Sequence, residues 1–268
     1  AQMVVARPFE AERDGMGLGE GWGMIVIERE SLARARGALV HAVITSMGAS
    51  NNHLGMVESS NVTQQIAIRA SFRGIPYGPD AVDLVECHAT STRQGDVEEV
   101  RALKAVFNSS KRTVITSFKS QIGHTLGASG INSLIRGVTA MKAGVFPPTL
   151  NYKHPDPEID LEGSGLLIAP EPLDWKGRAG EPRRLQVNAF GFGGSNYVVQ
   201  LEEGMDGEEK VLISAEKEAR TGGDHSALQG VSFFRTKVDG GSCRMAVVAQ
   251  SEEEALTALE ISASLIEA

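Results

Sequence analysis

The first 200 residues alternate between short apolar runs and longer amphipathic segments. Residues 96–107 begin with acidic side chains and carry apolar ones at helical spacing, and another helix is predicted from Asn61, with Gln64 in the capping-box position. Apolar and β-branched runs typical of buried strands occur at 22–28, 39–46, 82–88, 113–118, 166–169, 184–190 and 196–201. This alternation predicts an α/β fold.

A third helix is predicted over residues 126–142, although this segment contains three glycines. Glycine destabilises an isolated helix, so we expect close packing against a neighbouring element to be the reason for them. Residues 74–80 and 145–157 are rich in proline or glycine and are expected to be irregular connections.

The pattern changes in the last third of the chain. Residues 202–230 are acidic and weakly periodic, which is typical of a linker, and a short strand at 245–249 is followed by an acidic helix start at 251. We place the domain boundary at residue 203. Residues 1–203 form the main domain, and residues 204–268 form a linker and docking segment that is too short for an independent enzyme domain.

Composition and charge narrow the function classes. The chain has 268 residues and a formal charge of −8, which offers no basic footprint for nucleic acid or an anionic membrane surface. No apolar run approaches the roughly 20 residues of a membrane span, and the N-terminal residues do not resemble a signal peptide. Two cysteines, Cys87 and Cys243, cannot make a disulfide scaffold and indicate a reducing compartment, so we expect a cytoplasmic protein. A chain of this length needs no metal to hold its core.

Glycine is the compositional outlier, with 30 residues, many of them in short motifs. Five of them lie in residues 14–23, just before the first predicted strand. Their spacing fits neither the P-loop nor the dinucleotide fingerprint, so a tight loop packed under a sheet is favoured over a phosphate-binding loop.

A second motif, CHATSTRQGD at residues 87–96, follows a predicted strand, and the carboxyl ends of strands in α/β sheets are where ligands bind. A lone histidine there is more often structural than catalytic, but the small polar residues around His88 favour a site. Adjacent side chains on a strand point to opposite faces, so Cys87 is expected to be a small core residue and not a partner of His88.

Two further motifs combine glycine with polar or aromatic side chains. In KSQIGHTLGASG, Lys119 and His124 precede a predicted helix, where a neutral histidine could donate to a developing oxyanion; a helix-capping histidine with a surface lysine is an equal alternative. In NAFGFGGSN, residues 188–196, Phe192 tips a glycine-rich turn between two strands. This turn is either a hairpin packed on the core or a gate over a pocket.

Taken in order, HATST with GDVEE, KSQIGH with GASG, and NAFGFGGSN resemble the motifs of the C-terminal half of β-ketoacyl synthases, as does RPFEAERDGMGLGEG near the start. The resemblance covers residues 1–201. It implies a thiolase-like layered α/β/α fold whose other half is missing here, and a homodimer when complete. Ser133, where fatty-acid-type members carry glutamate, and the tail, which is similar to a post-ketosynthase linker, suggest a polyketide or polyunsaturated-fatty-acid type synthase.

The resemblance implies a decarboxylating Claisen condensation of an acyl thioester with malonyl on an acyl carrier protein. His88 and His124 match the family histidines that stabilise the enolate oxygen, and Lys119 matches the lysine that tunes their field. The carrier's phosphopantetheine arm brings the substrate, so no bound cofactor is expected. The other matched positions are Thr90 and Thr92 at the arm, Phe192 and Gly193 at the acyl gate and oxyanion hole, and Asp96, Glu99 and Asn196 as structural support.

The family's nucleophilic cysteine lies upstream of the matched region. Neither Cys87 nor Cys243 has its sequence setting, so we expect the isolated chain to be inactive and to expose apolar surface to the missing N-terminal half.

Two alternatives share the fold. A non-catalytic half-domain, similar to a chain-length factor, would serve assembly, but the intact His88, Lys119, His124 and Phe192 argue against it. A thiolase would need a further cysteine that residues 188–196 do not supply.

Overall fold

The computed structural model describes residues 5–52, 55, 58–107, 112–178 and 180–204, together with the backbone of 230–238 and 241–249. The chain divides into two compact units, Ala1–Gly207 and Glu208–Ala268.

The described part of the second unit is an antiparallel hairpin of β9 (Gly230–Val238) and β10 (Gly241–Ala249). β10 contains the strand predicted at 245–249, whereas β9 is absent from the sequence prediction. Residues 205–229 of the predicted linker and the predicted helix from 251 lie outside the described residues.

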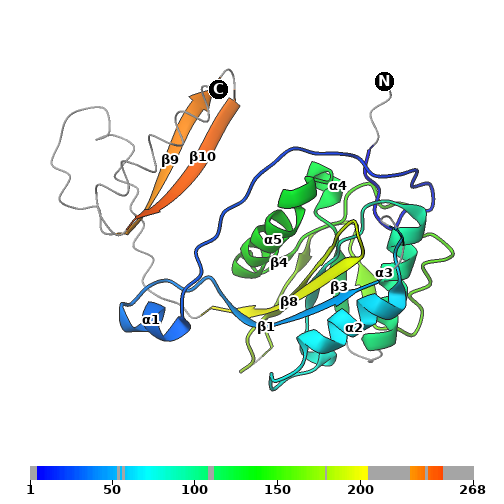
Figure 1. The fold of residues 1–268 in the computed structure, drawn as a ribbon, viewed down its shortest axis with the longest axis horizontal. Coiled ribbons are helices and arrows are strands. Elements are labelled where there is room, and N and C mark those ends of the chain that lie inside the picture. Colours follow the sequence, from blue (N-terminus) through cyan, green and yellow to red (C-terminus); the bar gives the residue numbers. More distant parts are fainter. Residues whose placement is uncertain are drawn as a thin grey trace. The chain divides into compact units, whose positions relative to one another are not determined.

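A six-stranded mixed sheet forms the centre of the first unit (Figure 1). β2 pairs in parallel with β7 and β3, β3 pairs in parallel with β5, and β8 runs antiparallel to both β7 and β1. The carboxyl ends of β2, β3, β5 and β7 therefore meet at one edge. The strands, in their order across the sheet, are β1 (Ala42–Asn51), β8 (Ser195–Glu203), β7 (Arg184–Phe190), β2 (Leu84–Glu86), β3 (Thr113–Thr116) and β5 (Leu166–Ile168).

Helices cover both faces of this sheet and give α/β/α layers. Figure 1 shows α2 (Asn61–Ser71) and α3 (Arg93–Val106) on one side and α5 (Ser129–Ala143) on the other. The shorter elements are α1 (Glu30–Ala35), α4 (Lys119–Ile122), β4 (Val145–Phe146), β6 (Leu173–Asp174) and the 3-10 turns Pro79–Ala81 and Leu126–Ala128.

Two apolar cores lie on the two faces because side chains alternate along each strand. Val85 and Cys87 pack into the core under α2 and α3, whereas Leu84 packs into the core under α5. The same alternation fixes where polar residues of these strands point, and it becomes important at the site.

The glycines of the third predicted helix lie close to the sheet, as expected. A Cβ on Gly137 would come within 2.5 Å of a Leu185 methyl of β7, and one on Gly130 within 3.3 Å of Ala189. Gly127 lies in the preceding 3-10 turn with no atom within 4 Å of such a Cβ. Close packing therefore explains two of the three glycines.

The buried strand predicted at 22–28 is wrong. This segment forms no strand within the described residues, and Trp22, Met24 and Ile27 are 57%, 68% and 67% exposed. An apolar run is buried only where other elements cover it, and none of the described strands pairs with this one.

α2 begins at Asn61 as predicted, but its cap and the start of α3 differ from the prediction. α2 is capped by Ser60, whose Oγ accepts the Thr63 N–H at 3.5 Å, and Gln64 is buried in the first turn and does not close a capping box at Asn61. α3 begins at Arg93, before the predicted start, because the Asp96 carboxylate binds two other loops and does not cap the helix.

Candidate active site

Three loops meet at the carboxyl edge of the parallel strands. The loop after β2 carries residues 87–92, the loop after β3 leads into Lys119 and His124, and the β7–β8 turn spans residues 191–194. This edge is where α/β folds bind ligands. The structure thus gathers the second, third and fourth glycine-bearing motifs.

The two histidines lie against each other. The ring centroids of His88 and His124 are 5.3 Å apart and the ring planes are nearly perpendicular, at 83°. The ring of Phe190, at the end of β7, also packs against the His88 ring, with the two centroids 5.8 Å apart. An apolar ring therefore limits the movement of His88.

Hydrogen bonding sets the tautomer of His124. Its Nδ1 accepts the backbone N–H of Leu126 at 3.2 Å, so in the neutral ring the proton is on Nε2. The backbone of His124 is held as well: its N–H donates to Gly17 at 2.7 Å, and its carbonyl accepts from Gly19 at 3.1 Å. His124 therefore has a fixed backbone and presents one N–H donor from its ring.

Burial and a neighbouring cation keep both imidazoles neutral. Burial, with the positive charge of Lys119, lowers the pKa of His124 to about 4. Burial, Lys119 and His124 lower the pKa of His88 well below its usual range. Burial also lowers the pKa of the Lys119 ammonium, against the opposing effect of the Glu86 and Glu99 carboxylates. Neutral imidazoles can donate hydrogen bonds in a dry site without adding charge to it.

Glu99 of α3 fixes the backbone of the second motif. Its Oε1 accepts the His88 N–H at 2.9 Å and its Oε2 accepts the Ala89 N–H at 2.7 Å. Asn188 of β7 donates to the same Oε1 at 2.8 Å. Glu99 is 1% exposed, so these bonds act with little competition from water.

Thr90 and Thr92 lie side by side on this loop, with their hydroxyl oxygens 3.1 Å apart. Gly95 leaves room for them, because a Cβ there would lie 2.4 Å from the Thr92 hydroxyl. Ser91 between them has a φ of +70°, a strained conformation for a non-glycine residue.

Asp96 stabilises this strained turn. Its carboxylate accepts the Ser91 N–H at 3.1 Å and the N–H of Phe9, another residue with positive φ, at 2.9 Å. Burial raises the pKa of Asp96 to about 7, against the effects of these bonds and of Arg13. Asp96 therefore joins the N-terminal segment to the threonine loop.

A buried ion pair lies on the other face of β2. Glu86 accepts the Phe118 N–H at 2.6 Å and pairs with Arg136 of α5 at 2.6 Å. Arg136 also donates to the Pro148 carbonyl at 2.8 Å and lies over the Phe118 ring, 5.1 Å from its centroid. This pair fixes the residue that precedes Lys119.

Phe192 and Gly193 form the exposed tip of the β7–β8 hairpin. Phe192 is 60% exposed, and Gly193 and Gly194 have φ values of +87° and +82°, which favour glycine. The base of the turn is anchored by Asn196, whose amide donates to Asn52 at 3.0 Å and to the Gly194 carbonyl at 3.2 Å. The motif is therefore the turn of a β-hairpin, but its tip at Phe192 is exposed and does not pack on the core.

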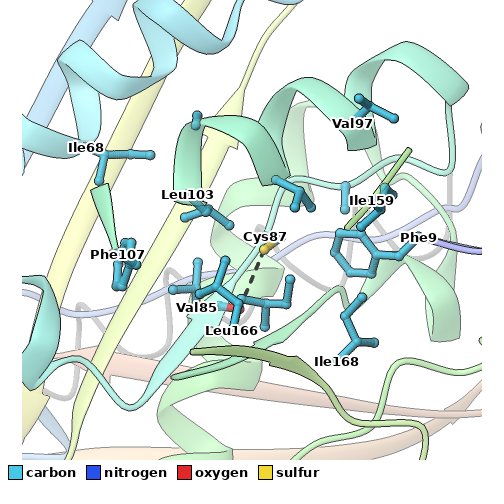
Figure 2. Close-up of a cluster of buried hydrophobic side chains, with 14 of the residues drawn as sticks. Phe9, Ile68, Val85, Cys87, Val97, Leu103, Phe107, Ile159, Leu166 and Ile168 are labelled. Atoms are coloured by element: carbon cyan, nitrogen blue, oxygen red, sulfur yellow. Dashed lines mark hydrogen bonds between the residues drawn. The ribbon is translucent and has the colours of Figure 1, made fainter. Parts of the chain in front are cut away.

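Cys87 directly follows β2 and belongs to the apolar core, as its place in the strand predicted at 82–88 implies. Figure 2 shows its sulfur among Leu103, Val85 and other apolar side chains, with its thiol directed at the Val85 carbonyl at 3.8 Å. Burial and the nearby carboxylates raise the pKa of the Cys87 thiol well above its usual range. A buried neutral thiol of this kind is a poor nucleophile. The side chain of Cys243 lies outside the described residues.

The glycine-rich segment at 14–23 packs against the His124 loop, and not under the sheet as expected. Leu18 forms a parallel bridge with His124, and a Cβ on Gly19 would lie 1.9 Å from the Ile122 carbonyl oxygen. From Leu18 onward the chain carries a set of exposed apolar side chains that we call the apolar strip, made up of Leu18, Trp22, Met24, Val26, Ile27 and Leu32.

Sequence reasoning missed four residues that shape the site. Glu86, Arg136 and Asn188 act through contacts between elements far apart in the chain. The charge of Glu86 within an apolar strand and the place of Asn188 in the fourth motif are the signals that could have drawn attention to them. Phe190 stands in the fourth motif, but its contact with His88 depends on the strand order.

Comparison with known proteins agrees with this geometry. Residues 41–153 match the family model of the β-ketoacyl synthase C-terminal domain. The chain carries the C-terminal part of a ketosynthase. Its similarity to polyketide synthases assigns this ketosynthase to the polyketide synthase type.

The similar curated proteins are large polyketide synthases. The chain is 39% identical over 206 residues to the spectinabilin polyketide synthase system protein NorB of Streptomyces orinoci, and 36% identical over 213 residues to erythronolide synthase EryA3 of Saccharopolyspora erythraea. These matches cover 74% and 76% of this chain, but the chain spans only 9% and 7% of those relatives.

Solved ketosynthases share the fold. The ketosynthase from module 6 of the bacillaene synthase of Bacillus subtilis 168 has a TM-score of 0.68 and 27% identity, covering 75% of this chain and 37% of that chain. The ishigamide ketosynthase/chain length factor has the same TM-score and identity, covering 76% and 48%. The layered α/β/α sheet is thus the thiolase-like fold that the resemblance implies.

Two features are absent from the described residues. None of the helices there has the length and apolar character needed to cross a membrane. In the same residues, histidine, cysteine, aspartate and glutamate side chains do not gather in threes as a metal site would require.

Proposed function

We propose that this chain supplies the enolate-stabilising half of a β-ketoacyl-[acyl carrier protein] synthase. The observation that carries the proposal is the contact of two neutral imidazoles, His88 and His124, at the carboxyl edge of the sheet. Two N–H donors at this edge would stabilise the negative oxygen that develops during decarboxylation.

The condensation would proceed in two steps. The bond between the malonyl carboxylate and its α-carbon breaks, releasing CO2 and leaving an enolate whose oxygen accepts from His88 and His124. The α-carbon then attacks the carbonyl carbon of an acyl thioester on a cysteine of the missing half. The carbon–sulfur bond breaks, the sulfur leaves as a thiolate, and the product stays on the carrier.

Each remaining loop has a proposed part in this reaction. Lys119, buried between carboxylates, would set the field at the histidines, while Thr90 and Thr92 present two hydroxyls to the phosphopantetheine arm of the acyl carrier protein. Phe192 would close over the acyl chain, with the backbone N–H groups of Phe192 and Gly193 near the acyl oxygen. The exposed position of Phe192 fits a gate that is open without substrate.

The apolar strip supports an N-terminal partner domain. Six large apolar side chains in or near an extended segment are exposed to water, which is unfavourable. Another domain that covered them would remove this cost. We propose that this domain is the nucleophile-bearing half of the ketosynthase, and that the complete protein is a homodimer.

The test is malonyl decarboxylation by the complete ketosynthase of the parent synthase. We expect His88→Ala and His124→Ala each to lower kcat by about 100-fold or more, because each removes a donor to the developing oxyanion. His154→Ala, which changes an exposed histidine outside the site, is the matched control and should keep full activity. Full activity in both site variants would overturn the proposal.

The second candidate is a non-catalytic half-domain similar to a chain-length factor. One similar structure is named as a ketosynthase/chain length factor. A complete parent protein that assembles with a condensing partner but shows no decarboxylation even with both histidines intact would favour this candidate.

A further inference from the structure

A continuous row of buried side-chain amides lies on the α2/α3 face of the sheet and ends at Glu99. Gln186 and Asn188 are two residues apart on β7, so they face the same side, and Gln200 of β8 stands directly opposite Gln186. All three are at most 1% exposed. Their position in the strand pairing places three amides in one dry layer.

The amides are joined head to tail. The Gln200 amide nitrogen donates to the Gln186 oxygen at 2.8 Å, the Gln186 nitrogen donates to the Asn188 oxygen at 2.8 Å, and the Asn188 nitrogen donates to Glu99 at 2.8 Å. At the far end, the Gln200 nitrogen also donates to the Ser71 hydroxyl of α2 at 2.9 Å. Every amide therefore points its N–H end toward the carboxylate.

We propose that Asn188, Gln186 and Gln200 are positioning residues that hold Glu99 as an acceptor for the backbone N–H groups of His88 and Ala89. Hydrogen-bonded amides polarise one another in a low-dielectric layer, so each donor in the row strengthens the next. The row acts on the enolate site only through Glu99, because Glu99 is its single contact with the histidine loop in the described structure.

Burying three amides in this layer costs free energy, and the need to fill the layer does not explain why amides are there. Three apolar side chains of similar volume would fill this layer without any polar group to satisfy. Instead, within the described residues, the Gln200 side-chain oxygen is buried with no partner. The amides are oriented so that the unpaired oxygen lies at the end far from Glu99, while the end next to Glu99 donates a hydrogen bond to its carboxylate.

The decisive measurement is the titration of Glu99 in the full chain, followed by carbon-13 NMR of labelled glutamate and assigned with Glu99→Gln. Lys119, Asp96 and Cys87 also interact electrostatically with Glu99. We expect the Glu99 midpoint to rise by about one pH unit or more in Asn188→Ala, since a donor to the charged form is lost.

Gln186→Met and Gln200→Met test the row itself. Methionine keeps the length of the side chain but cannot donate, so we expect the Glu99 midpoint to rise less in Gln186→Met than in Asn188→Ala, and least in Gln200→Met. The His88 and Ala89 amide protons should shift upfield in the same order. Gln65→Met on α2 is the control, because Gln65 bonds to Asn61 outside the row.

The NMR test of the amide row can be decided separately from the proposed function. Only the importance of the row for catalysis rests on that proposed function. If the folded Gln186→Met and Gln200→Met variants match Gln65→Met in both signals, the proposal is overturned, even if their stability changes. The NMR result holds whether or not the complete ketosynthase decarboxylates malonyl, and the histidine variants decide that question separately.

Discussion

The loops around His88 and the apolar strip meet at His124, yet they are held in opposite ways. Buried acceptors fix the backbone of the His88 loop through Glu99 and Asp96, and the Glu86–Arg136 pair fixes the loop that leads to Lys119. The strip contributes exposed apolar side chains and, in the described residues, no strand pairing beyond the bridge at Leu18. Internal bonds therefore hold the His88 loop, whereas the strip presents apolar surface with few such bonds.

The largest effect on stability is expected at the Glu86–Arg136 pair. Arg136→Met leaves the Glu86 charge buried without its cation and should lower the free energy of unfolding by about 3–5 kcal/mol in urea denaturation. The double variant Glu86→Gln with Arg136→Met should recover much of this loss. If Arg136→Met is as stable as the wild type, the loops do not depend on the Glu86–Arg136 ion pair.

The histidines predict the pH dependence of stability. His124 has a folded pKa of about 4 against an ordinary value of 6.5, so the unfolded chain binds the proton more tightly between these values. Stability should be full above pH 6.5 and fall as the pH is lowered toward 4, by up to about 3 kcal/mol from this residue.

Urea unfolding at several pH values measures this slope. His124→Asn should flatten the fall relative to the wild type, while His154→Asn should leave it unchanged. An equal slope in His124→Asn and the wild type would contradict the burial of a neutral ring.

A smaller effect is expected where α5 approaches the sheet. Gly137→Ala puts a methyl group against buried Leu185 and should cost about 1 kcal/mol net, because overpacking outweighs the gain in helix propensity. Gly127→Ala, with open space around it, is the matched control. Equal unfolding free energies for the two variants would argue against the close approach.

The smallest effect on the isolated chain is expected in the apolar strip. Met24→Ser and Ile27→Ser change exposed side chains and should alter its unfolding free energy by less than about 0.5 kcal/mol. The same changes should abolish activity when the chain is combined with a separately produced N-terminal half. A large loss of stability in the isolated chain would mean that the strip is already covered.

The loops of the site could be predicted from the sequence, because each loop depends on residues close together in the chain. Glycines and small hydroxyl residues mark the turns at 87–96, 119–130 and 188–196, and these turns lie at the expected edge of the sheet.

The contacts between residues far apart in the chain could not be predicted from the sequence. The partner of Glu86 is fifty residues away on α5, and the row from Gln200 to Glu99 depends on the β7–β8 register. The strand predicted at 22–28 fails for the same reason, because burial depends on elements that its own pattern cannot specify.

The alternation along β2 has a consequence for how this protein can change over time. Leu84 and Glu86 face α5, whereas Val85 and Cys87 face α2 and α3. Inserting or deleting one residue would exchange the two sets, placing a carboxylate in the apolar core and a thiol opposite Arg136. Natural variants of this protein should therefore differ by substitution within β2, while changes of chain length accumulate in the surface connections.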